Sequence, residues 1–288
     1  MARPFLKWAG GKAKLAPRIL ASAPPAFGRY VEPFTGAGAV FFAAEERRPG
    51  LKAVLNDANA DLIETFAILR DSPDALVAKL EALSREYLGQ DVEERRALYY
   101  RVRADEPADG PGRAARFIFL NRTCYNGLFR VNARGGFNVP HGRYKNPRIL
   151  DADLLAVCSA ALQRAEVSSE DFAATCEAAQ PGDFVYLDPP YHPVSATSSF
   201  TGYTRADFGR TDQVRLKDAF AALTERGVAA MLSNSDHEFV RGLYAGAGYR
   251  IDEVSMSRAI NSRGTGRRPI AELLIDNFEL VGAAPRER

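Results

Sequence analysis

Four consecutive residues, Asp188, Pro189, Pro190 and Tyr191, bear the groups that a binding site for a planar base requires. They follow the apolar run 184–187, which we expect to be a buried strand. Because proline has no N–H group and a fixed φ, the strand must end here. The Asp188 carboxylate and the Pro189 carbonyl can then accept two hydrogen bonds from one amino group, while the Tyr191 ring stacks on the base. A proline-rich turn with an exposed Asp188 is the alternative interpretation of the tetrapeptide alone.

A glycine-containing turn at 32–38 follows a short predicted strand at 30–31 and precedes a predicted helix at 39–47. Gly36 and Gly38 would let the backbone approach a ligand closely and present the N–H groups of a helix N-terminus to it. An ordinary tight turn is the alternative interpretation of this segment.

A third strand end bears a carboxylate. The predicted strand 52–55 is followed by Asn56 and Asp57, where nucleotide-binding α/β folds place the acidic side chain that holds ribose hydroxyls. Ligands of open α/β sheets bind beyond the carboxyl ends of the strands, which is where all three segments lie. The sequence therefore predicts a site of nucleoside size.

The remaining sequence predicts an α/β fold with a largely helical insert. Apolar residues recur at helical spacing through 71–103, and a helical pattern resumes at 113–121 after a turn rich in Gly and Pro. We place the insert at 65–147. After the tetrapeptide we expect helices at 211–226 and 236–245 and strands at 228–232, 251–254 and 271–277.

The segment 110–150 contains eight basic residues and no Asp or Glu. Aromatic residues and asparagines are interleaved with these cations, a pattern typical of a surface that contacts phosphates and reads base edges. A solvated basic face is the alternative. A second basic segment, 258–268, predicts either a contact to a DNA backbone or an exposed hairpin loop. The net charge of +2 is too small to indicate a nucleic-acid partner by itself.

The composition argues against several classes of protein. No apolar stretch approaches the roughly 20 residues of a membrane span, and the first residues lack the apolar core of a signal peptide, so we expect a cytoplasmic protein without membrane contact. Cys124, Cys158 and Cys176 lie far apart without flanking histidines, which argues against a disulfide framework and a structural zinc. We expect reduced thiols, no metal, and a monomer in solution, of which more than one copy can occupy DNA.

In their order, these segments resemble the Dam-type DNA adenine methyltransferases of the alpha group. The resemblance covers almost the whole chain and rests on the segments 5–12, 32–38, 56–63, 120–130, 137–145, 188–191 and 198–203. It implies the Rossmann-like sheet of the S-adenosylmethionine-dependent methyltransferases with an inserted target-recognition domain. The implied division is a first catalytic part at 1–64, a helical DNA target-recognition domain with a reader hairpin at 65–147, and a second catalytic part at 148–288. The implied reaction is transfer of methyl from S-adenosylmethionine to the exocyclic amine of an adenine flipped out of double-stranded DNA.

The resemblance also implies a set of cofactor contacts. These are Trp8, Lys12, Glu32, Phe34, Gly36, Gly38, Asp57 and Asp188. Glu32 would face the methionine end of S-adenosylmethionine, and Asp57 would face its ribose. The segment around Lys12 is no phosphate-binding P-loop, because the first glycine of that pattern is missing and Ala13 replaces the Ser or Thr that holds magnesium.

The implied DNA contacts are Tyr125, Asn126, Leu128, Arg130, Pro140, Arg143, Tyr144 and Lys145. Arg130 would hold a guanine through two hydrogen bonds, Leu128 would touch a thymine methyl, and Tyr144 and Lys145 would lie near the vacated base. Together they imply the target GATC. The chain departs from the family pattern at 123–124, at Phe129 and at 262–266, positions that concern phosphate contacts and flanking preference rather than the central recognition.

The implied catalytic residues are Asp188, Pro189, Pro190 and Tyr191. Adenine's amine is a poor nucleophile because its lone pair is delocalised into the ring, and the acceptors on Asp188 and Pro189 would stabilise the positive charge that builds on it. An aspartate of ordinary pKa is too weak a base to remove the amine proton first, so it accepts or relays that proton afterwards. The adenine must leave the helical stack to react, and Tyr191 would stack on it.

Two other functions remain open. A related amino methyltransferase would act on RNA, on another DNA motif or on a protein glutamine, and the basic insert argues against the glutamine. A sequence-specific DNA-binding protein that has lost catalysis is the second, and the intact Asp188, Tyr191, Gly36, Gly38 and Asp57 argue against it.

Overall fold

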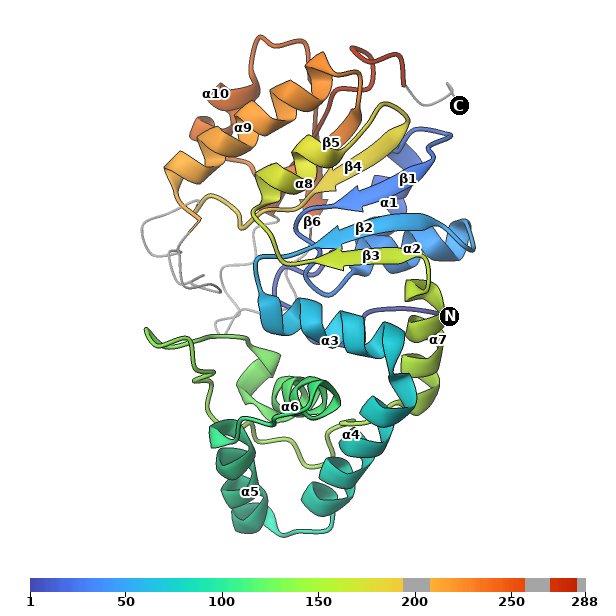
Figure 1. Ribbon diagram of the computed structural model, residues 1–288. Helices are drawn as coiled ribbons and strands as arrows, with labels where there is room; N and C mark the ends of the chain where they lie inside the picture. The colour runs from blue at the N-terminus through green and yellow to red at the C-terminus, as the bar shows by residue number, and fades with distance from the viewer. Residues whose placement is uncertain (194–207, 257–269, 284–288) are drawn as a thin grey trace. The chain divides into compact units, whose positions relative to one another are not determined.

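The computed structural model describes residues 1–193, 208–256 and 270–283, which form helices and strands (Figure 1). The chain divides into two compact units. The described part of the first comprises Met1–Ala21 and Thr35–Ser169, and that of the second comprises Ser22–Phe34 with the described residues from 170 onward. The segment 198–203 and the basic segment 258–268, including the departure at 262–266, lie outside the described residues.

The first unit is mainly helical. Its strands β2 (Lys52–Asn56) and β3 (Ala165–Ser168) pair in parallel, with Ala53 opposite Ala165. Its helices are α1 (Ala16–Ser22), α2 (Ala39–Arg47), α3 (Ala60–Asp71), α4 (Pro73–Leu88), α5 (Val92–Ala104), α6 (Gly110–Thr123) and α7 (Ala152–Leu162), with a 3₁₀ turn η1 (Tyr125–Gly127). The helices predicted within 71–103 and at 113–121 are therefore present. The division predicted between residues 64 and 65 falls within α3, so it marks no break in secondary structure.

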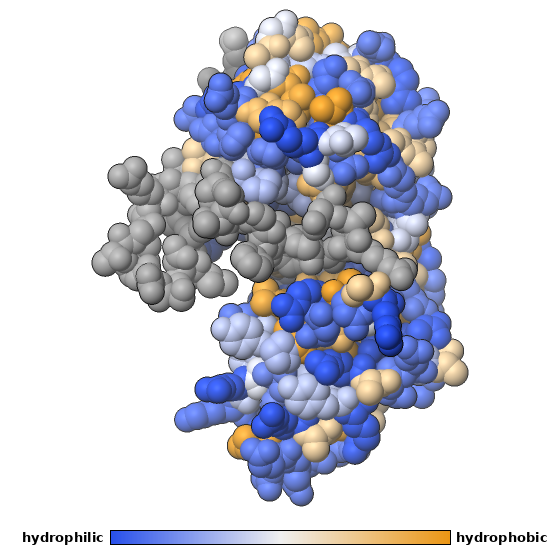
Figure 2. All heavy atoms as spheres, turned by 90° about the vertical axis from the view of Figure 1, so that its left-hand side faces the viewer, coloured by the Kyte–Doolittle hydropathy of each residue, from blue (hydrophilic) through white to orange (hydrophobic). Residues whose placement is uncertain are grey.

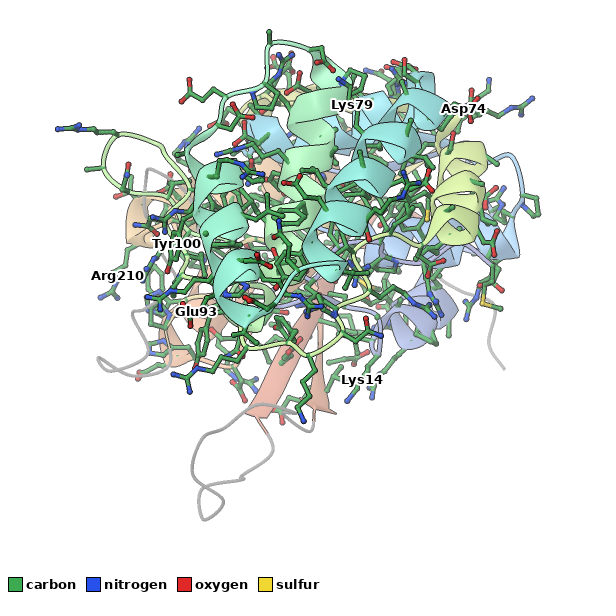
Figure 3. The ribbon with its side chains drawn as sticks, turned by 90° about the horizontal axis from the view of Figure 1, so that it is seen from below. Lys14, Asp74, Lys79, Glu93, Tyr100 and Arg210 are labelled. Atoms are coloured by element: carbon green, nitrogen blue, oxygen red, sulfur yellow. The ribbon has the colours of Figure 1, made fainter. Side chains whose placement is uncertain are left out.

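Side chains at the helix starts explain why the insert is helical in these places. Asn59 and Asp109 each accept a backbone N–H group at the start of α3 and α6, and Asp91 forms a reciprocal capping box with Glu94 at α5. Each cap satisfies a donor that the helix itself leaves open. The opposite faces of α4 and α5 bear exposed charges such as Lys79 (Figure 3).

An aromatic core joins α4, α5 and α6 to the loop that follows α6. Tyr87, Tyr99 and Phe119 are completely buried, and the Tyr87 ring meets that of Phe119 edge-on at 5.5 Å. The Tyr87 hydroxyl lies 2.7 Å from Nε2 of His141, and the Tyr99 hydroxyl donates to the Val139 carbonyl at 2.8 Å. Buried hydroxyls require partners, so these two bonds fix the position of the loop.

The second unit is built on a five-stranded arrangement. Its strands are β1 (Arg29–Glu32), β4 (Asp183–Leu187), β5 (Ala229–Ser235), β6 (Arg250–Met256) and β7 (Ile270–Asp276). They lie in the order β1-β4-β5-β7-β6, in which β1, β4 and β5 are parallel while β7 is antiparallel to both neighbours. Every residue of β4 and β5 is buried, as expected for parallel strands covered on both faces. The strands predicted at 184–187, 228–232, 251–254 and 271–277 are all present.

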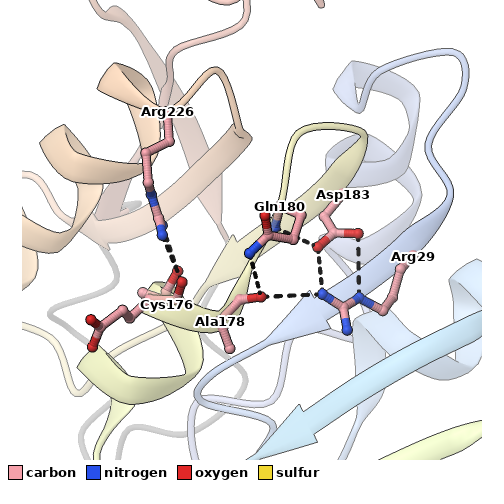
Figure 4. A network of polar contacts seen from close by, with 7 residues as sticks. Arg29, Cys176, Ala178, Gln180, Asp183 and Arg226 are labelled. Carbon is pink, nitrogen blue, oxygen red and sulfur yellow. Dashed lines mark hydrogen bonds and ion pairs between the residues drawn. The ribbon is translucent and has the colours of Figure 1, made fainter.

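Three helices of the second unit pack near these strands. They are α8 (Phe172–Ala178), α9 (Arg210–Glu225) and α10 (Glu238–Tyr244). Figure 4 shows how two arginines hold the C-terminal end of α8: Arg226 donates to the Cys176 carbonyl at 2.7 Å, and Arg29 donates to the Ala178 carbonyl at 3.4 Å. Arg29 also pairs with Asp183 at 2.7 Å. The last carbonyls of a helix lack partners within it, so these cations stabilise α8 and tie it to β1 and β4.

The face of the molecule in Figure 2 is mainly hydrophilic, and the three cysteines are buried. The apolar residues on this face are scattered. None of the described helices has the length and apolarity needed to cross a membrane. Cys124, Cys158 and Cys176 are buried free thiols, and burial raises the pKa of the first two to about 11, which disfavours the reactive thiolate.

Candidate active site and nucleic-acid interface

The glycine turn of the first unit is built against Trp8. Gly36 has a φ of 49° and Gly38 a φ of 70°, a region that residues with a side chain rarely adopt. A Cβ atom added at Gly36 would lie 2.9 Å from Cδ1 of Trp8. The turn therefore requires glycine at this position for its backbone and for the indole ring packed on it. The helix α2 begins directly after the turn, so the first backbone N–H groups of α2, which have no partner within the helix, lie next to the turn.

Asp57, directly after β2, closes this turn. Its Oδ2 accepts the N–H of Gly36 at 2.9 Å, and its Oδ1 accepts the N–H of Asn59 at 3.0 Å. Burial raises the pKa of the Asp57 carboxyl, and the two N–H donors oppose that rise. Each carboxylate oxygen has two acceptor positions, so both can still accept a hydroxyl. The sequence predicted a ribose-binding group, and the structure adds a second task, that of fixing the glycine turn.

Trp8 and Lys12 occupy different environments in the first unit. The Trp8 indole stacks on the rings of Phe129 and Phe117, with centroids 5.7 and 6.5 Å away. The Lys12 side chain is buried, and its ammonium donates to the Gly10 carbonyl at 2.9 Å. Phe129, where the chain departs from the family pattern, is thus the residue that connects the Trp8 segment with the loop bearing Arg130.

In the second unit, two carboxylates lie at the carboxyl ends of neighbouring parallel strands. β1 ends at Glu32, and β4 is followed by Asp188. Tyr30 and Tyr186 are completely buried beside them. Burial, together with the nearby Glu32 and Asp188 carboxylates, raises the pKa of both tyrosines well above the ordinary value. Their hydroxyls therefore stay protonated and uncharged at neutral pH next to the two acids.

The segment after β4 contains Tyr191, whose hydroxyl forms a hydrogen bond with another strand. Its ring is half-buried, and its hydroxyl donates to Oε2 of Glu272 on β7 at 2.8 Å. Burial and the Asp188 charge raise the Tyr191 pKa, so the phenol remains a donor. Pro189 is buried, whereas Asp188 and Pro190 are half-buried. The predicted catalytic tetrapeptide is therefore an ordered turn at a strand end, as the sequence suggested.

Phe34, predicted to contact a cofactor, belongs to an aromatic cluster of the second unit. Its ring is stacked on Phe172 with centroids 5.2 Å apart, and it meets Phe208 edge-on at 5.8 Å. Phe34 itself is half-buried. The contacts with Phe172 and Phe208 thus fix the Phe34 ring, part of which stays accessible to solvent.

The segment 125–130, which resembles the family's reader hairpin, leads into a narrow two-stranded loop of the first unit, the hairpin 130–138. Val131 and Phe137 form an isolated antiparallel bridge, and the Asn138 N–H donates to the Arg130 carbonyl at 2.9 Å. At the tip, Oδ1 of Asn132 accepts backbone N–H groups, which closes the turn. The Arg130 side chain lies across the hairpin, with its Nε donating to Oδ1 of Asn138 at 2.7 Å.

Most of the predicted DNA contacts are open to solvent. Exposed side chains are those of Tyr125, Asn126, Arg130, Pro140, Arg143 and Lys145, and half-buried ones are those of Leu128 and Tyr144. Asn126 adopts a left-handed conformation with φ of 56°. The Lys7 ammonium lies 3.9 Å above the Tyr144 ring, a cation–π contact that orients the ring. All eight side chains are therefore at least partly accessible in the first unit.

Comparison with known proteins decides the family. A model of the D12 class N6 adenine-specific DNA methyltransferases matches residues 8–260. The chain belongs to this family. It is 42% identical to the Type II methyltransferase M.MjaIII of Methanocaldococcus jannaschii, with 96% of this chain and 99% of that protein covered. It is 37% identical to the DNA adenine methylase of Escherichia coli strain K12, with 94% of each protein covered.

Family membership makes the chain an adenine-specific DNA methyltransferase, and it confirms the predicted resemblance, enzyme class and fold class. DNA is the substrate of this family, and its reaction requires a methyl donor of the S-adenosylmethionine type. Among the described residues, no group of three or more His, Cys, Asp or Glu side chains is arranged to hold a metal ion.

Several residues around the methyltransferase site were not predicted. Lys7 belongs to the segment 5–12 but was assigned no role, yet it contacts Tyr144, and the Asn121 side chain holds its backbone N–H at 2.8 Å and its carbonyl at 2.7 Å. Glu272 is the partner of Tyr191, but it lies in a strand where nothing distinguishes it from a surface acid. These roles depend on contacts between segments far apart in sequence, which spacing does not reveal.

Proposed function

We propose that the enzyme transfers methyl from S-adenosylmethionine to the N6 amine of an adenine flipped out of double-stranded DNA, within the sequence GATC. The observation that supports this most directly is the ordered turn of Asp188 and Pro189 at the end of β4, beside a held Tyr191 ring. This turn offers two acceptors and an aromatic face, which is what an exocyclic amine on a planar base needs.

The residues of the first unit fit the proposed cofactor. Gly36 and Gly38 bring the backbone within reach of a ligand, and Asp57 has acceptor positions left for ribose hydroxyls. Trp8 packs on the turn, and the Lys12 ammonium is held at the Gly10 carbonyl. Glu32 and Phe34 of the second unit, with Asp188, complete the proposed set. When bound, S-adenosylmethionine supplies a methyl group on a positively charged sulfur.

Asp188 and Pro189 are proposed to act on the amine by accepting its two N–H groups. Two acceptors favour a pyramidal nitrogen and stabilise the positive charge that develops as this nitrogen attacks. The Asp188 carboxylate then accepts or relays the proton that the methylated amine loses. Pro190 limits the backbone of the turn through its ring, and Tyr191 stacks on the base.

The hairpin is proposed to read the target. Arg130 offers two donors to a guanine, and Leu128 offers an apolar contact to a thymine methyl. The bond from Arg130 to Asn138 restricts the guanidinium before DNA arrives, so less side-chain freedom is lost on binding. Tyr125, Asn126, Pro140 and Arg143 are proposed to lie on the DNA, with Tyr144 and Lys145 near the vacated base.

We also propose the division into catalytic parts at 1–64 and 148–288 with a target-recognition domain at 65–147. The hairpin and the helices that anchor it belong to this middle part. We also propose that the enzyme is a monomer in solution. Because DNA is the substrate, we propose a cytoplasmic location.

Expression in a host without adenine methylation, followed by long-read sequencing of the genome, tests the reaction and the target together. N6-methyladenine confined to GATC supports both. Methylation of another motif would keep the chemistry and overturn the roles of Leu128 and Arg130. Soluble, cofactor-binding protein that leaves the DNA unmodified would point to RNA or another substrate, and the absence of cofactor binding would point to a DNA-binding protein without catalysis.

A further inference from the structure

Two completely buried amide side chains surround the turn that bears Tyr191. Gln213 lies on α9 and Asn234 on β5. Nδ2 of Asn234 donates to Oε1 of Gln213 at 2.9 Å, and Nε2 of Gln213 donates onward to the Pro190 carbonyl at 3.1 Å. Oδ1 of Asn234 accepts the His192 N–H at 3.3 Å. The pair therefore contacts the backbone on both sides of Tyr191.

Burial fixes which way the side-chain amides of Gln213 and Asn234 face. A buried amide that loses a partner costs about 1–3 kcal/mol, so each donor must face an acceptor. Oδ1 of Asn234 is set by two backbone donors, because it also accepts the Ser235 N–H at 2.8 Å. Its Nδ2 must then face Gln213, which in turn points Nε2 at Pro190. Turning either amide over would place like groups together at every contact.

The turn needs such support because its prolines restrict only half of its backbone freedom. Each proline ring fixes φ but leaves ψ free to rotate. A rotation about ψ at Pro190 would redirect the Pro190 carbonyl and the Tyr191 ring relative to Asp188 and the Pro189 carbonyl. The bonds to the Pro190 carbonyl and the His192 N–H remove that rotation. The Ser235 hydroxyl adds a third bond, to the His192 carbonyl at 2.7 Å.

We propose that Gln213 and Asn234 are positioning residues for methyl transfer: they fix the backbone around Tyr191 and thereby the aim of Asp188 and the Pro189 carbonyl. The inference rests on the proposed role of this turn in catalysis. Neither amide touches the reacting groups, so both act through the turn. Misplacement of a reacting group by about 1 Å lowers rates on the order of 100-fold, which is the scale at which such support matters.

The variant Gln213→Glu tests this through pH. Its carboxyl still accepts from Asn234, but when ionised it turns an oxygen instead of an N–H group toward the Pro190 carbonyl. Protonation restores a donor there, and burial raises the pKa of such a carboxyl. At about pH 8 we expect single-turnover methyl transfer to fall by about 10- to 100-fold, with little change in the KM for DNA. Between about pH 8 and pH 6 the ratio to the unmodified enzyme should rise toward one.

Asn277→Asp is the matched control. Asn277 is also buried in the second unit, where it bonds the backbone of Ala230 and Val228 and not the turn. Its variant introduces the same buried acid and should lower the melting temperature without this pH-dependent loss of rate. A Gln213→Glu variant that transfers methyl at the unmodified rate, or whose rate ratio does not change with pH, would overturn the proposal.

Two further measurements separate this inference from the proposed function. Hydrogen exchange at His192 should be faster in Gln213→Glu than in the unmodified enzyme at pH 8, and equal protection would count against the clamp whatever the substrate. Methylation of DNA by the unmodified enzyme tests the reaction itself. If Gln213→Glu does not fold, Asn234→Asp, which loses only the donor to Gln213, should show the same recovery at low pH, and a flat profile would overturn the proposal.

Discussion

The Tyr191 hydroxyl donates a hydrogen bond of 2.8 Å to the carboxylate of Glu272 on strand β7. The bond joins the turn after β4 to β7, two segments that are separated by 81 residues. It holds the far end of an aromatic ring whose near end is attached to a backbone restricted by two prolines and by the hydrogen bonds with Gln213 and Asn234. A ring held at both ends offers its face to a base without losing rotational freedom on binding.

Removing either partner of this bond should weaken catalysis to the same extent. Tyr191→Phe and Glu272→Ala each delete the bond, and we expect each to lower the rate of methyl transfer by roughly 5- to 30-fold, the equivalent of one or two kcal/mol. The double variant should lose less than the two single losses added together, because both changes remove this bond. The fluorescence of 2-aminopurine at the target position, which rises when the base leaves the stack, should fall in parallel.

Tyr244→Phe provides the comparison for this cycle. Tyr244 is a buried tyrosine on α10 that packs against Phe220 and Tyr249, away from the turn. Its variant should retain the rate and the fluorescence signal. Losses that add in the double variant would show that Glu272 acts on something other than the Tyr191 hydroxyl.

Gly36→Ala should prevent cofactor binding more than it destabilises the fold. The positive φ alone costs an alanine roughly 1–2 kcal/mol, and the new Cβ would meet the Trp8 indole at 2.9 Å, which must displace the ring or the turn. Equilibrium binding of labelled S-adenosylmethionine should therefore fall by at least about 100-fold. Gly246→Ala is the control, because Gly246 has a φ of 77° and nothing within 4 Å of the added Cβ. Equal loss of binding in both variants would refute a specific role of Gly36.

The parts of the site that the sequence predicted are those set by local chemistry. Two prolines end a strand wherever they occur, so the turn at Asp188 follows from the residues themselves. The same holds for Gly36 and Gly38, whose positive φ values favour glycine. Apolar spacing likewise predicted the helices of the insert.

The parts that the sequence did not predict depend on contacts across the fold. Gln213 reads as an ordinary polar residue of an amphipathic helix, and only the packing of α9 against the strands buries it beneath the turn. Asn234 and Glu272 similarly reveal their partners only when β4, β5 and β7 lie side by side. Spacing along one strand cannot identify the residue opposite it, because register is set by tertiary pairing.

Arg130 should determine one base of the target, and Asn138 should sharpen that choice. The guanidinium contacts both the side chain and the carbonyl of Asn138, at 2.7 and 3.4 Å. Arg130→Ala should cost about 1–3 kcal/mol of discrimination at the guanine position. Asn138→Ala should produce a smaller loss at the same position, because the arginine remains but its direction is no longer restricted. Methylation of duplexes that differ by one base in the target measures both effects.

Arg134→Ala separates base reading from attraction to phosphates. Arg134 is exposed at the hairpin tip and bonds to Asn132 only through its backbone N–H, among the contacts of the described residues. Its loss should weaken binding to all sequences alike and reduce the salt dependence by about one unit of slope. A change of preferred base in Arg134→Ala, or none in Arg130→Ala, would contradict the assignment of the reader.

His141 should make the anchor of the hairpin sensitive to acid. Burial and the charges of Arg96 and Arg95 lower its pKa from the ordinary value of 6.5. The unfolded chain therefore binds a proton at His141 more readily than the folded chain does, so stability falls as pH drops below 6.5 and through the lowered value. Protonation also makes Nε2 a donor, so the Tyr87 hydroxyl 2.7 Å away must become the acceptor.

The melting temperature between about pH 7.5 and pH 5.5 tests this expectation. The unmodified enzyme should lose more stability over this interval than His141→Gln, whose side chain can pair with the Tyr87 hydroxyl but does not titrate. His192, whose pKa is also lowered by burial, is present in both proteins, so its contribution cancels in the comparison. An equal loss in both would mean that the acid sensitivity arises elsewhere and that the contact with Tyr87 survives protonation of the imidazole.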